Sequence, residues 1–533
     1  MKTLKLHNAD NCAVALKALA TGAIETIDGR VLKIKENIKP KHRFTLTDIP
    51  KNSAIIMYGI KVGKAITPIE TGQLLSIKNV THDTEDYLND VASIENKTIE
   101  TRAFKNVSFN GYYRKDGLVG TQNIWLVLPL VFCENRNIKI MEDAFLEELG
   151  FKRPNSYKAL VRSLMNKENT EQTTVQNRYF KNIDGIKFLT HHSGCGGTRE
   201  DAQLLCQLIA GYIANPNVAG ATILSLGCQN AQTSLLNEAL EKLHPATEKP
   251  LHIFEQQHLG SEETLLTEAI TATFKSLTEI NTIERQAAPL SKLVIGLECG
   301  GSDGFSGISA NPVVGHLSDI IVSLGGSSLL AEFPELCGVE PQLKSRMKNP
   351  NDVKKFDDLM TTYAARAEAV GSGFDMNPSP GNIKDGLITD AMKSAGAAKK
   401  GGSMPISGVL DYTEQIKAPG LNLLCTPGND VESTTGLAGS GANIILFTTG
   451  LGTPTGNPIT PVIKISSNNE LAERMPDIID YSAGDIITGE KTIAACAHEL
   501  LDIIIAIASG NKQSKAQQLE QNDFIPWKRG ISL

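Results

Sequence analysis

The sequence predicts an α/β protein that begins with a small, mostly β module and continues with two α/β domains whose sheets are largely parallel. The first part of the chain holds short alternating segments such as "SAIIMYG", separated by turn sequences such as "TPIETG". Farther along, β-type runs such as "ATILSLGCQN" alternate with helical patterns such as "QTSLLNEALEKL", which indicates parallel strands covered by helices. A length of 533 residues suits about three domains.

These patterns also place the domain boundaries. We expect the β module to span residues 1–82 and a polar, acidic linker to span 83–108, where "THDTEDYLND" shows no clear apolar period. Residues 109–285 are expected to form the first α/β domain. A polar bridge, "SLTEINTIERQAAPLSK", precedes the runs "LVIGLEC", "GLNLLCTPGND" and "NIILFTTGLGTP", which indicate a C-terminal α/β domain over 286–533.

Composition excludes several classes of partner. The formal net charge is −7 and no dense basic tract occurs, so we expect no nucleic-acid binding. The longest apolar run, "IWLVLPLVFC" at 124–133, is shorter than the roughly 20 residues of a membrane-spanning helix. The first twenty residues lack the apolar core of a signal peptide, which predicts a cytoplasmic protein. In that compartment the nine cysteines are expected to be free thiols or metal ligands.

Four β-type runs end in small polar residues, namely "FLTHHSGCGG", "ILSLGCQN", "VIGLECGGSDG" and "LLCTPGND". Ligands bind outside the carboxyl ends of parallel strands, so these endings predict the walls of a small-molecule site. His191, Cys195, Cys228 and Cys299 are its candidate soft ligands. The structural alternatives are a histidine that is hydrogen-bonded at a strand end and cysteines that act as small buried hydrophobes.

Six segments, in order along the chain, resemble the altronate and galactarate dehydratases: "NGYYRKDGLVGTQNIWLV" (110–127), "HHSGCGG" (191–197), "LECGGSDGFSGISANP" (297–312), "NPSPGN" (377–382), "TPGND" (426–430) and "FTTGLGTPTGNP" (447–458). The N-terminal module resembles the small β-clip (SAF) domain of the same family. The resemblance implies a cytoplasmic hydro-lyase that converts D-altronate to 2-dehydro-3-deoxy-D-gluconate in hexuronate catabolism. It also implies a homo-oligomer, which we expect to be a dimer.

The chemistry of such a reaction defines the candidate residues. Removing the C2 proton builds charge on the substrate carboxylate, which a divalent metal or fixed donors must stabilise. The resemblance suggests Fe²⁺, with Mn²⁺ or Mg²⁺ as substitutes, and His191, Cys195 and Cys299 are the candidate metal ligands. The catalytic candidates are His191, Glu298, Asp303 and Lys393, and Lys400 is an alternative to Lys393. The substrate-binding candidates are Arg114, Asp116, Asn123, Ser302, Ser306, Asn311, Asn377, Ser379, Asn382, Asn429, Asp430 and Thr449.

The chain also departs from the family pattern. "SIKN" at 76–79 stands where relatives often carry His-x-His-Asn, and Gln122 and Leu451 stand where arginine is usual. Loss of two fixed cations favours a substrate with one carboxylate over one with two. The alternatives are a galactarate dehydratase, a hydro-lyase with an iron–sulfur cluster on Cys195, Cys228 and Cys299, and a sugar-acid-binding protein without catalysis.

Overall fold

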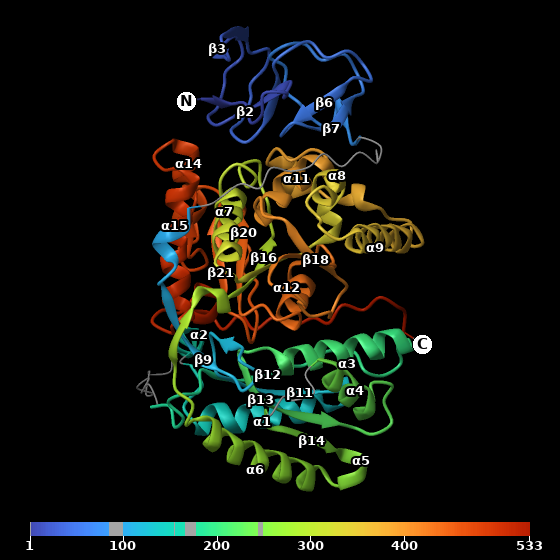
Figure 1. The fold of residues 1–533 in the computed structure, drawn as a ribbon, viewed down its shortest axis with the longest axis vertical. Helices are drawn as coiled ribbons and strands as arrows, with labels where there is room; N and C mark the ends of the chain where they lie inside the picture. The colour runs from blue at the N-terminus through green and yellow to red at the C-terminus, as the bar shows by residue number, and fades with distance from the viewer. Residues whose placement is uncertain (1, 85–99, 154, 166–176, 244–248, 533) are drawn as a thin grey trace. The chain divides into compact units, whose positions relative to one another are not determined.

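The computed structural model describes residues 2–84, 100–153, 155–165, 177–243 and 249–532, and the chain divides into two compact units (Figure 1). Unit 1 contains residues 1–110 and 287–527, and unit 2 contains 111–286 and 528–533. The N-terminal β module and the C-terminal α/β part therefore belong to one unit. The expected linker falls largely on residues 85–99, which lie outside the described residues; the short turn η1 (Arg102–Phe104) follows them.

The β module of unit 1 consists of short strands, as predicted, and the structure shows that they pair antiparallel. They are β1 (Thr3–Leu4), β2 (Cys12–Ala15), β3 (Ile24–Ile27), β4 (Arg30–Lys33), β5 (Arg43–Thr45), β6 (Ala54–Met57), β7 (Ile60–Ala65) and β8 (Val80–Thr81). β2 pairs with β1 and β5, β3 pairs with β4, and β7 pairs with β6 and β8. Phe44 is fully buried in the small core of this module, among aliphatic side chains such as Leu19 and Ile38.

A seven-stranded sheet forms the centre of the remainder of unit 1. From edge to edge its strands are β18 (Ile406–Leu410), β19 (Gly420–Leu424), β17 (Ser327–Leu330), β16 (Val294–Cys299), β20 (Ile444–Thr449), β21 (Val462–Ser466) and β22 (Tyr481–Ser482). Every neighbouring pair is parallel, which confirms the predicted sheet type. The inner strands are almost entirely apolar because helices and loops bury both of their faces. All carboxyl ends consequently lie at one edge.

Helices cover this sheet. α7 (Ala310–Ser323) packs against β17, β19 and β20 and against α15 (Ile493–Ala508). Leu437 of α12 (Asp430–Gly439) and Ala516 of α16 (Lys515–Gln518) pack in a core with Leu329 and Phe447. The other elements of this part are η3 (Leu290–Lys292), η4 (Phe333–Leu336), α8 (Glu340–Lys344), α9 (Pro350–Glu368), η5 (Phe374–Met376), α10 (Pro380–Lys384), α11 (Asp390–Ala397), η6 (Ala398–Gly401), α13 (Asn469–Arg474) and α14 (Asp485–Thr488).

Unit 2 contains a four-stranded parallel sheet in the order β12 (Gly185–Phe188), β11 (Ile124–Pro129), β13 (Val218–Ser225) and β14 (Leu251–Glu255). α1 (Asn135–Glu148) and α6 (Glu262–Ile280) bury a core with Trp125 and Val127 of β11, while α3 (Arg199–Ala214) and α4 (Thr233–Leu243) pack together at the other face (Figure 1). The unit also holds η2 (Phe132–Glu134), α2 (Ser156–Leu164) and α5 (Gln256–Leu259). β10 (Val119–Gly120), β9 (Ser108–Tyr113) and β15 (Gln286–Pro289) form a small sheet, and the chain passes between the units within β9 and at β15.

Within the described residues, no helix has the length and apolar character that crossing a membrane requires.

Candidate functional site

The carboxyl edge of the seven-stranded sheet gathers buried acidic groups. Glu298 and Cys299 are the last two residues of β16, and Glu332 comes shortly after β17. The chain then passes through η4, which carries Glu335. Because β16 and β17 are parallel neighbours, these side chains meet at the edge where parallel sheets bind ligands.

Two lysines pair with these acids. We call the whole group the acid–lysine cluster: Glu298, Cys299, Glu332, Glu335, Lys393 and Lys400. Lys400 Nζ donates to Glu332 Oε2 over 2.8 Å, and Lys393 Nζ donates to Glu335 Oε1 over 2.6 Å. The Cys299 thiol donates to Glu335 Oε2 over 3.0 Å. The Lys400 side chain is only 1% exposed and that of Lys393 only 10%, so both ion pairs are largely removed from water.

The two lysines are positioned by one short helical segment. Lys393 lies on α11, whose N-terminus is capped by Thr389, with its Oγ1 accepting from Met392 N over 3.2 Å. Lys400 lies on η6, which continues directly from α11. This segment therefore delivers both ammonium groups to the acids.

Glu332 is held in a backbone conformation that residues with a side chain rarely adopt, at a φ of +69°. Its N–H donates to Thr426 Oγ1 over 2.8 Å, and its Oε2 accepts from Cys299 N over 3.1 Å. Such local strain persists only where the surrounding structure imposes it, and it is typical of functional sites.

The electrostatics of the cluster separate its acids into two kinds. Burial, followed by the nearby charge of Glu332, raises the pKa of Glu298 well above its usual value, which favours the protonated form of this carboxyl. Burial acts in the same direction on Glu335, but Lys393 and Lys400 outweigh it and hold the pKa of Glu335 below its usual value. Burial opposes the charge of both lysines, yet the surrounding acids raise the pKa of each. Both ammonium groups therefore stay charged.

Two further groups titrate near neutrality beside the cluster. Burial and then the charges of Glu332 and Glu335 raise the pKa of Asp430 to about 7. Burial lowers the pKa of Lys464 on β21 to about 7, and its ammonium group lies 4.2 Å from the centre of the Phe447 ring. Groups with such values are candidates for proton transfer.

A small polar cavity adjoins the cluster and shares Lys393 with it. Four other residues predicted for the site line the same cavity, namely Ser302, Asp303, Ser306 and Asn311, together with Tyr58 of the β module. The structure thus brings these five predicted residues together in unit 1.

Asp303 itself is fully engaged in this loop. Its Oδ1 accepts from the N–H of Phe305 over 3.1 Å and from the N–H of Ser306 over 2.9 Å, while its Oδ2 pairs with Lys41 Nζ over 2.9 Å. Asp303 is fully buried, so these contacts are what satisfies its charge. The arrangement makes Asp303 an organiser of the cavity wall.

The remaining predicted residues of unit 1 lie around the same edge. Asn377 Oδ1 accepts from Lys393 Nζ over 2.7 Å. Ser379 and Asn382 form the capping box of α10, and Asn382 Nδ2 donates to Ser302 O over 2.7 Å. Asn429 caps α12, which starts at Asp430, and Thr449 ends β20 with its Oγ1 accepting from Gly452 N over 2.9 Å.

Arg114, Asp116 and Asn123 belong to unit 2, where their side chains form hydrogen bonds with backbone atoms. Arg114 Nε donates to Pro216 O over 2.7 Å and its NH1 group donates to Asn123 Oδ1 over 3.0 Å. Asp116 accepts from Leu118 N over 3.0 Å within a turn. Their role as substrate ligands stays a prediction.

His191 also lies in unit 2, at the carboxyl edge of the four-stranded sheet. Its Nε2 donates to Pro129 O over 2.8 Å, and its Nδ1 accepts from Ser193 N over 3.1 Å. Burial lowers the pKa of His191 to about 4, so the imidazole is neutral at pH 7. Both ring nitrogens thus bond to backbone, and the metal set of His191, Cys195 and Cys299 is divided between the two units. This metal set remains a prediction.

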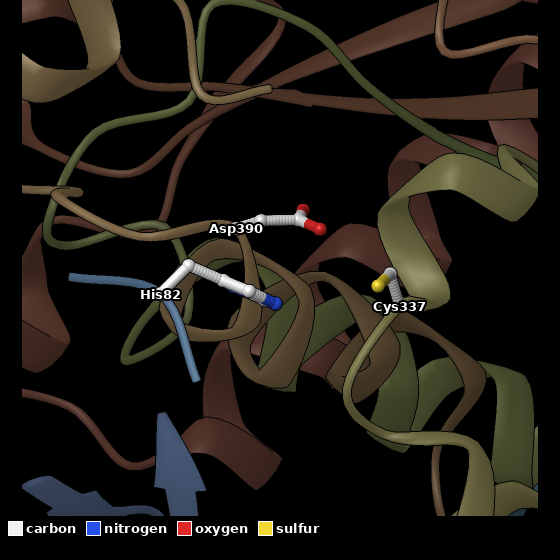
Figure 2. A group of neighbouring side chains, drawn as sticks. All are labelled: His82, Cys337 and Asp390. Atoms are coloured by element: carbon white, nitrogen blue, oxygen red, sulfur yellow. The ribbon is translucent and has the colours of Figure 1, made fainter. Parts of the chain in front are cut away.

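Three groups of side chains in the described part of unit 1 bring metal-binding atoms within 4.8 Å of one another. Two belong to the sheet edge: Cys299 with Glu332 and Glu335, and Glu298 with Glu332 and Asp430. The third, His82, Cys337 and Asp390, joins the end of the β module to the start of α11 (Figure 2). Burial is the main reason why the pKa of Asp390 is raised to about 8.

Sequence reasoning missed Glu332, Glu335 and Lys464. The two glutamates stand three positions apart after the run "SSLLA", but they lack the glycine-rich setting that marks the other loops. Lys464 is a single charge inside the apolar strand "VIKIS". A buried strand that contains one lysine is a signal that was available, because an unpaired charge is costly in a core.

The fold and the residues at the carboxyl edge of the seven-stranded sheet define an α/β enzyme with buried acid–base groups and a small N-terminal β module. Comparison with known families agrees. Residues 290–532 match the C-terminal domain of D-galactarate/altronate dehydratases, and residues 111–281 match the second domain of D-galactarate dehydratase/altronate hydrolase. Residues 1–83 match the altronate/galactarate dehydratase SAF domain. The chain belongs to the D-galactarate/altronate dehydratase family.

Individual relatives cover the chain from end to end. Altronate dehydratase of Escherichia coli K12 is 31% identical over 100% of both chains, and altronate dehydratase of Bacillus subtilis 168 is 32% identical over 99% of both. Galactarate dehydratase (L-threo-forming) of E. coli K12 is 29% identical over 97% of this chain and 94% of its own.

Proposed function

We propose that this chain is a hydro-lyase that removes water from D-altronate to give 2-dehydro-3-deoxy-D-gluconate. The observation that carries the proposal is the acid–lysine cluster beside a polar cavity, in a chain of the dehydratase family. The cluster combines a buried carboxyl, whose protonated form is favoured, with two charged ammonium groups, and the side chains of Ser302, Ser306 and Asn311 line the adjoining cavity. Elimination of water next to a carboxylate needs these components.

The reaction divides into proton and charge transfers that these residues can perform. A base removes the proton on C2, and Asp430 has the appropriate pKa of about 7 and is partly exposed. Lys393 and Lys400 stabilise the negative charge that builds on the substrate carboxylate. The protonated Glu298 donates to the C3 hydroxyl, which leaves as water. The resulting enol then takes a solvent proton at C3 and becomes the 2-keto acid.

The oxygen donors at this edge fit a hard divalent cation. Glu298 Oε1 and Glu332 Oε1 are buried without a hydrogen-bond partner, and both carboxylates approach Asp430. We propose that these three residues, in their ionised form, would hold Fe²⁺, Mn²⁺ or Mg²⁺; Glu298 and Asp430 would then serve as ligands and not as acid and base. When bound, such a cation supplies positive charge that favours ionisation of the C2 position.

The test is an anaerobic assay of the full-length, iron-supplemented protein against a panel of aldonates and aldarates, with detection of the 2-keto acid. We expect turnover of D-altronate and weaker turnover of galactarate, because Leu451, whose N–H donates to Gly301 O over 2.9 Å in unit 1, provides no cation for a second carboxylate. Preference for galactarate would favour the galactarate dehydratase alternative. Ligand-dependent melting without keto-acid formation from any acid would favour a binding protein and contradict the proposal.

A further inference from the structure

Three exposed cysteines lie at the carboxyl edge of the four-stranded sheet in unit 2, each just after a different strand. Cys133 lies in η2, just after β11, while Cys195 and Cys228 lie in the loops after β12 and β13. β11 is the direct neighbour of both β12 and β13. Since all these strands are parallel, the three loops emerge side by side at one edge.

Backbone hydrogen bonds join the three loops close to the cysteines. Phe132 N donates to Ser193 O over 3.1 Å, and Ala231 N donates to Gly194 O over 3.1 Å. Gly194 has a φ of +99°, and a Cβ atom there would lie 2.1 Å from Leu130 O. Glycine is therefore required for this close approach of the loops. The result is a fixed backbone frame around the thiols.

Each of three adjacent loops contributes one exposed thiol to this frame. Among the described residues, however, these sulfur atoms do not form a group within 4.8 Å of one another, as the donors of the unit 1 groups do. A single ion draws its ligands to short mutual distances, whereas a polynuclear cluster holds thiolates farther apart. Gln257 Nε2 also donates to Cys228 Sγ over 3.2 Å, a contact of the kind that tunes cluster sulfurs.

We propose that Cys133, Cys195 and Cys228 bind a [4Fe–4S] cluster through three thiolates. The fourth cysteine of unit 2, Cys206, is buried on α3. One iron would consequently have no cysteine ligand and would accept water or an oxygen of a small molecule. Cys195 lines a polar pocket of unit 2, which also presents Ser193, Asn230 and Lys528.

This set differs from the cysteine triad expected from the sequence. Cys299 belongs to unit 1, is buried, and donates its thiol hydrogen to Glu335 over 3.0 Å. Cys133 takes its place because strand order, and not spacing along the chain, brings it beside Cys195 and Cys228. The inference concerns cofactor content alone, so it stands or falls independently of the sugar acid that the enzyme uses.

The experiment reconstitutes the full-length protein anaerobically with ferrous iron and sulfide and then measures bound iron, acid-labile sulfide and visible absorption. We expect about four iron and four sulfide per chain for a cluster of this type, in addition to any iron held by the carboxylates of unit 1. Cys133→Ser, Cys195→Ser and Cys228→Ser should each lose most of the iron, sulfide and visible absorption. Cys206→Ala and Cys299→Ala should keep all three, and far-ultraviolet circular dichroism checks that each variant is folded.

A second measurement uses only the wild-type protein, so it tests the proposal even when a variant fails to fold. Alkylation of the wild-type protein followed by mass spectrometry should show that reconstitution protects Cys133, Cys195 and Cys228 together. Acid-labile sulfide and visible absorption that survive Cys133→Ser would place the cluster elsewhere and overturn the proposal. A colourless protein, a bound zinc ion with no sulfide, or three thiols that stay reactive after reconstitution would overturn it as well.

Discussion

At the scale of single residues, the acid–lysine cluster depends on balanced buried charge. Lys400 and Glu332 form an ion pair, and each side chain is 1% exposed. Lys393 and Glu335 form a second ion pair, in which the side chains are 10% and 3% exposed. Removing one member of such a pair leaves its partner charged and buried, which costs more than the pair contributes. The chain therefore keeps these residues in pairs, and their charges are available to a substrate without reorganisation.

Lys400→Met tests this balance. We expect a loss of about 3 kcal/mol in the free energy of unfolding, because Glu332 loses its buried partner. Turnover should fall by about 100-fold or more if Lys400 stabilises developing charge. Urea unfolding and steady-state kinetics measure the two effects. The double variant with Glu332→Gln should recover much of the stability but not the activity; simple additivity of the two stability losses would contradict the pairing.

Asp430 gives a prediction about pH. Its folded pKa of about 7 lies above the value of about 3.9 for an unfolded aspartate, so the folded protein binds the extra proton between these values. The contribution of Asp430 to stability therefore falls as the pH rises from about 4 to about 7. Relative to Asp430→Asn, the wild type should lose stability over that window and change little above it. Chemical unfolding of both proteins at several pH values measures the difference, and a constant difference would refute the raised pKa.

At the scale of elements, the carboxyl ends of parallel strands and the caps of short helices position the site. Glu298 and Cys299 could be predicted because a strand-like apolar run stops at them before glycines. Glu332 could not, since it reaches the site only through the pairing of β16 with β17. His191 was selected for its chemistry, but the sequence does not reveal that Pro129 and Ser193 bond both of its nitrogens. Cys133 was not selected, because it is the last residue of an apolar run and no glycine follows it.

Thr389→Ala probes the helix that carries Lys393. Loss of the cap on α11 should destabilise unit 1 by about 1 kcal/mol and, by loosening Lys393, should also lower kcat. Thr389 Oγ1 additionally donates to Val62 O over 2.6 Å, which ties α11 to the β module. Thr492→Ala is the matched control, because Thr492 caps α15, which carries no cluster residue. Equal losses of stability with equal kcat in both variants would argue against a positioning role for α11.

At the scale of the whole molecule, the chain combines two units, and the β module is part of the unit that holds the acid–lysine cluster. The three-part α/β order and the parallel sheets were evident from the sequence because periodic apolar runs report local structure directly. That the β module supports the cavity was not evident. Lys41 and Arg43 of the module contact the loop 302–306, which lines the cavity. Lys41 pairs with Asp303, and Arg43 donates to Gly304 O over 3.1 Å.

Lys41→Ala tests this support. Asp303 is fully buried, so removal of its Lys41 partner should lower the melting temperature and raise KM by loosening the cavity loop. Lys35→Ala is the control, because Lys35 pairs with Glu70 on the surface of the same module, where such pairs contribute little. Differential scanning calorimetry and substrate titration measure both effects. Indistinguishable behaviour of the two variants would show that the β module does not support the site.

The most direct test of the central claim is an NMR assay of D-altronate in D₂O with the wild-type protein, Lys393→Met and the surface control Lys384→Met. The account predicts that the wild type and the control form 2-dehydro-3-deoxy-D-gluconate with one solvent deuterium at C3. Lys393→Met should remain folded but form almost none. Full turnover by Lys393→Met, or no keto acid from the wild type, would contradict a dehydratase that operates at the acid–lysine cluster.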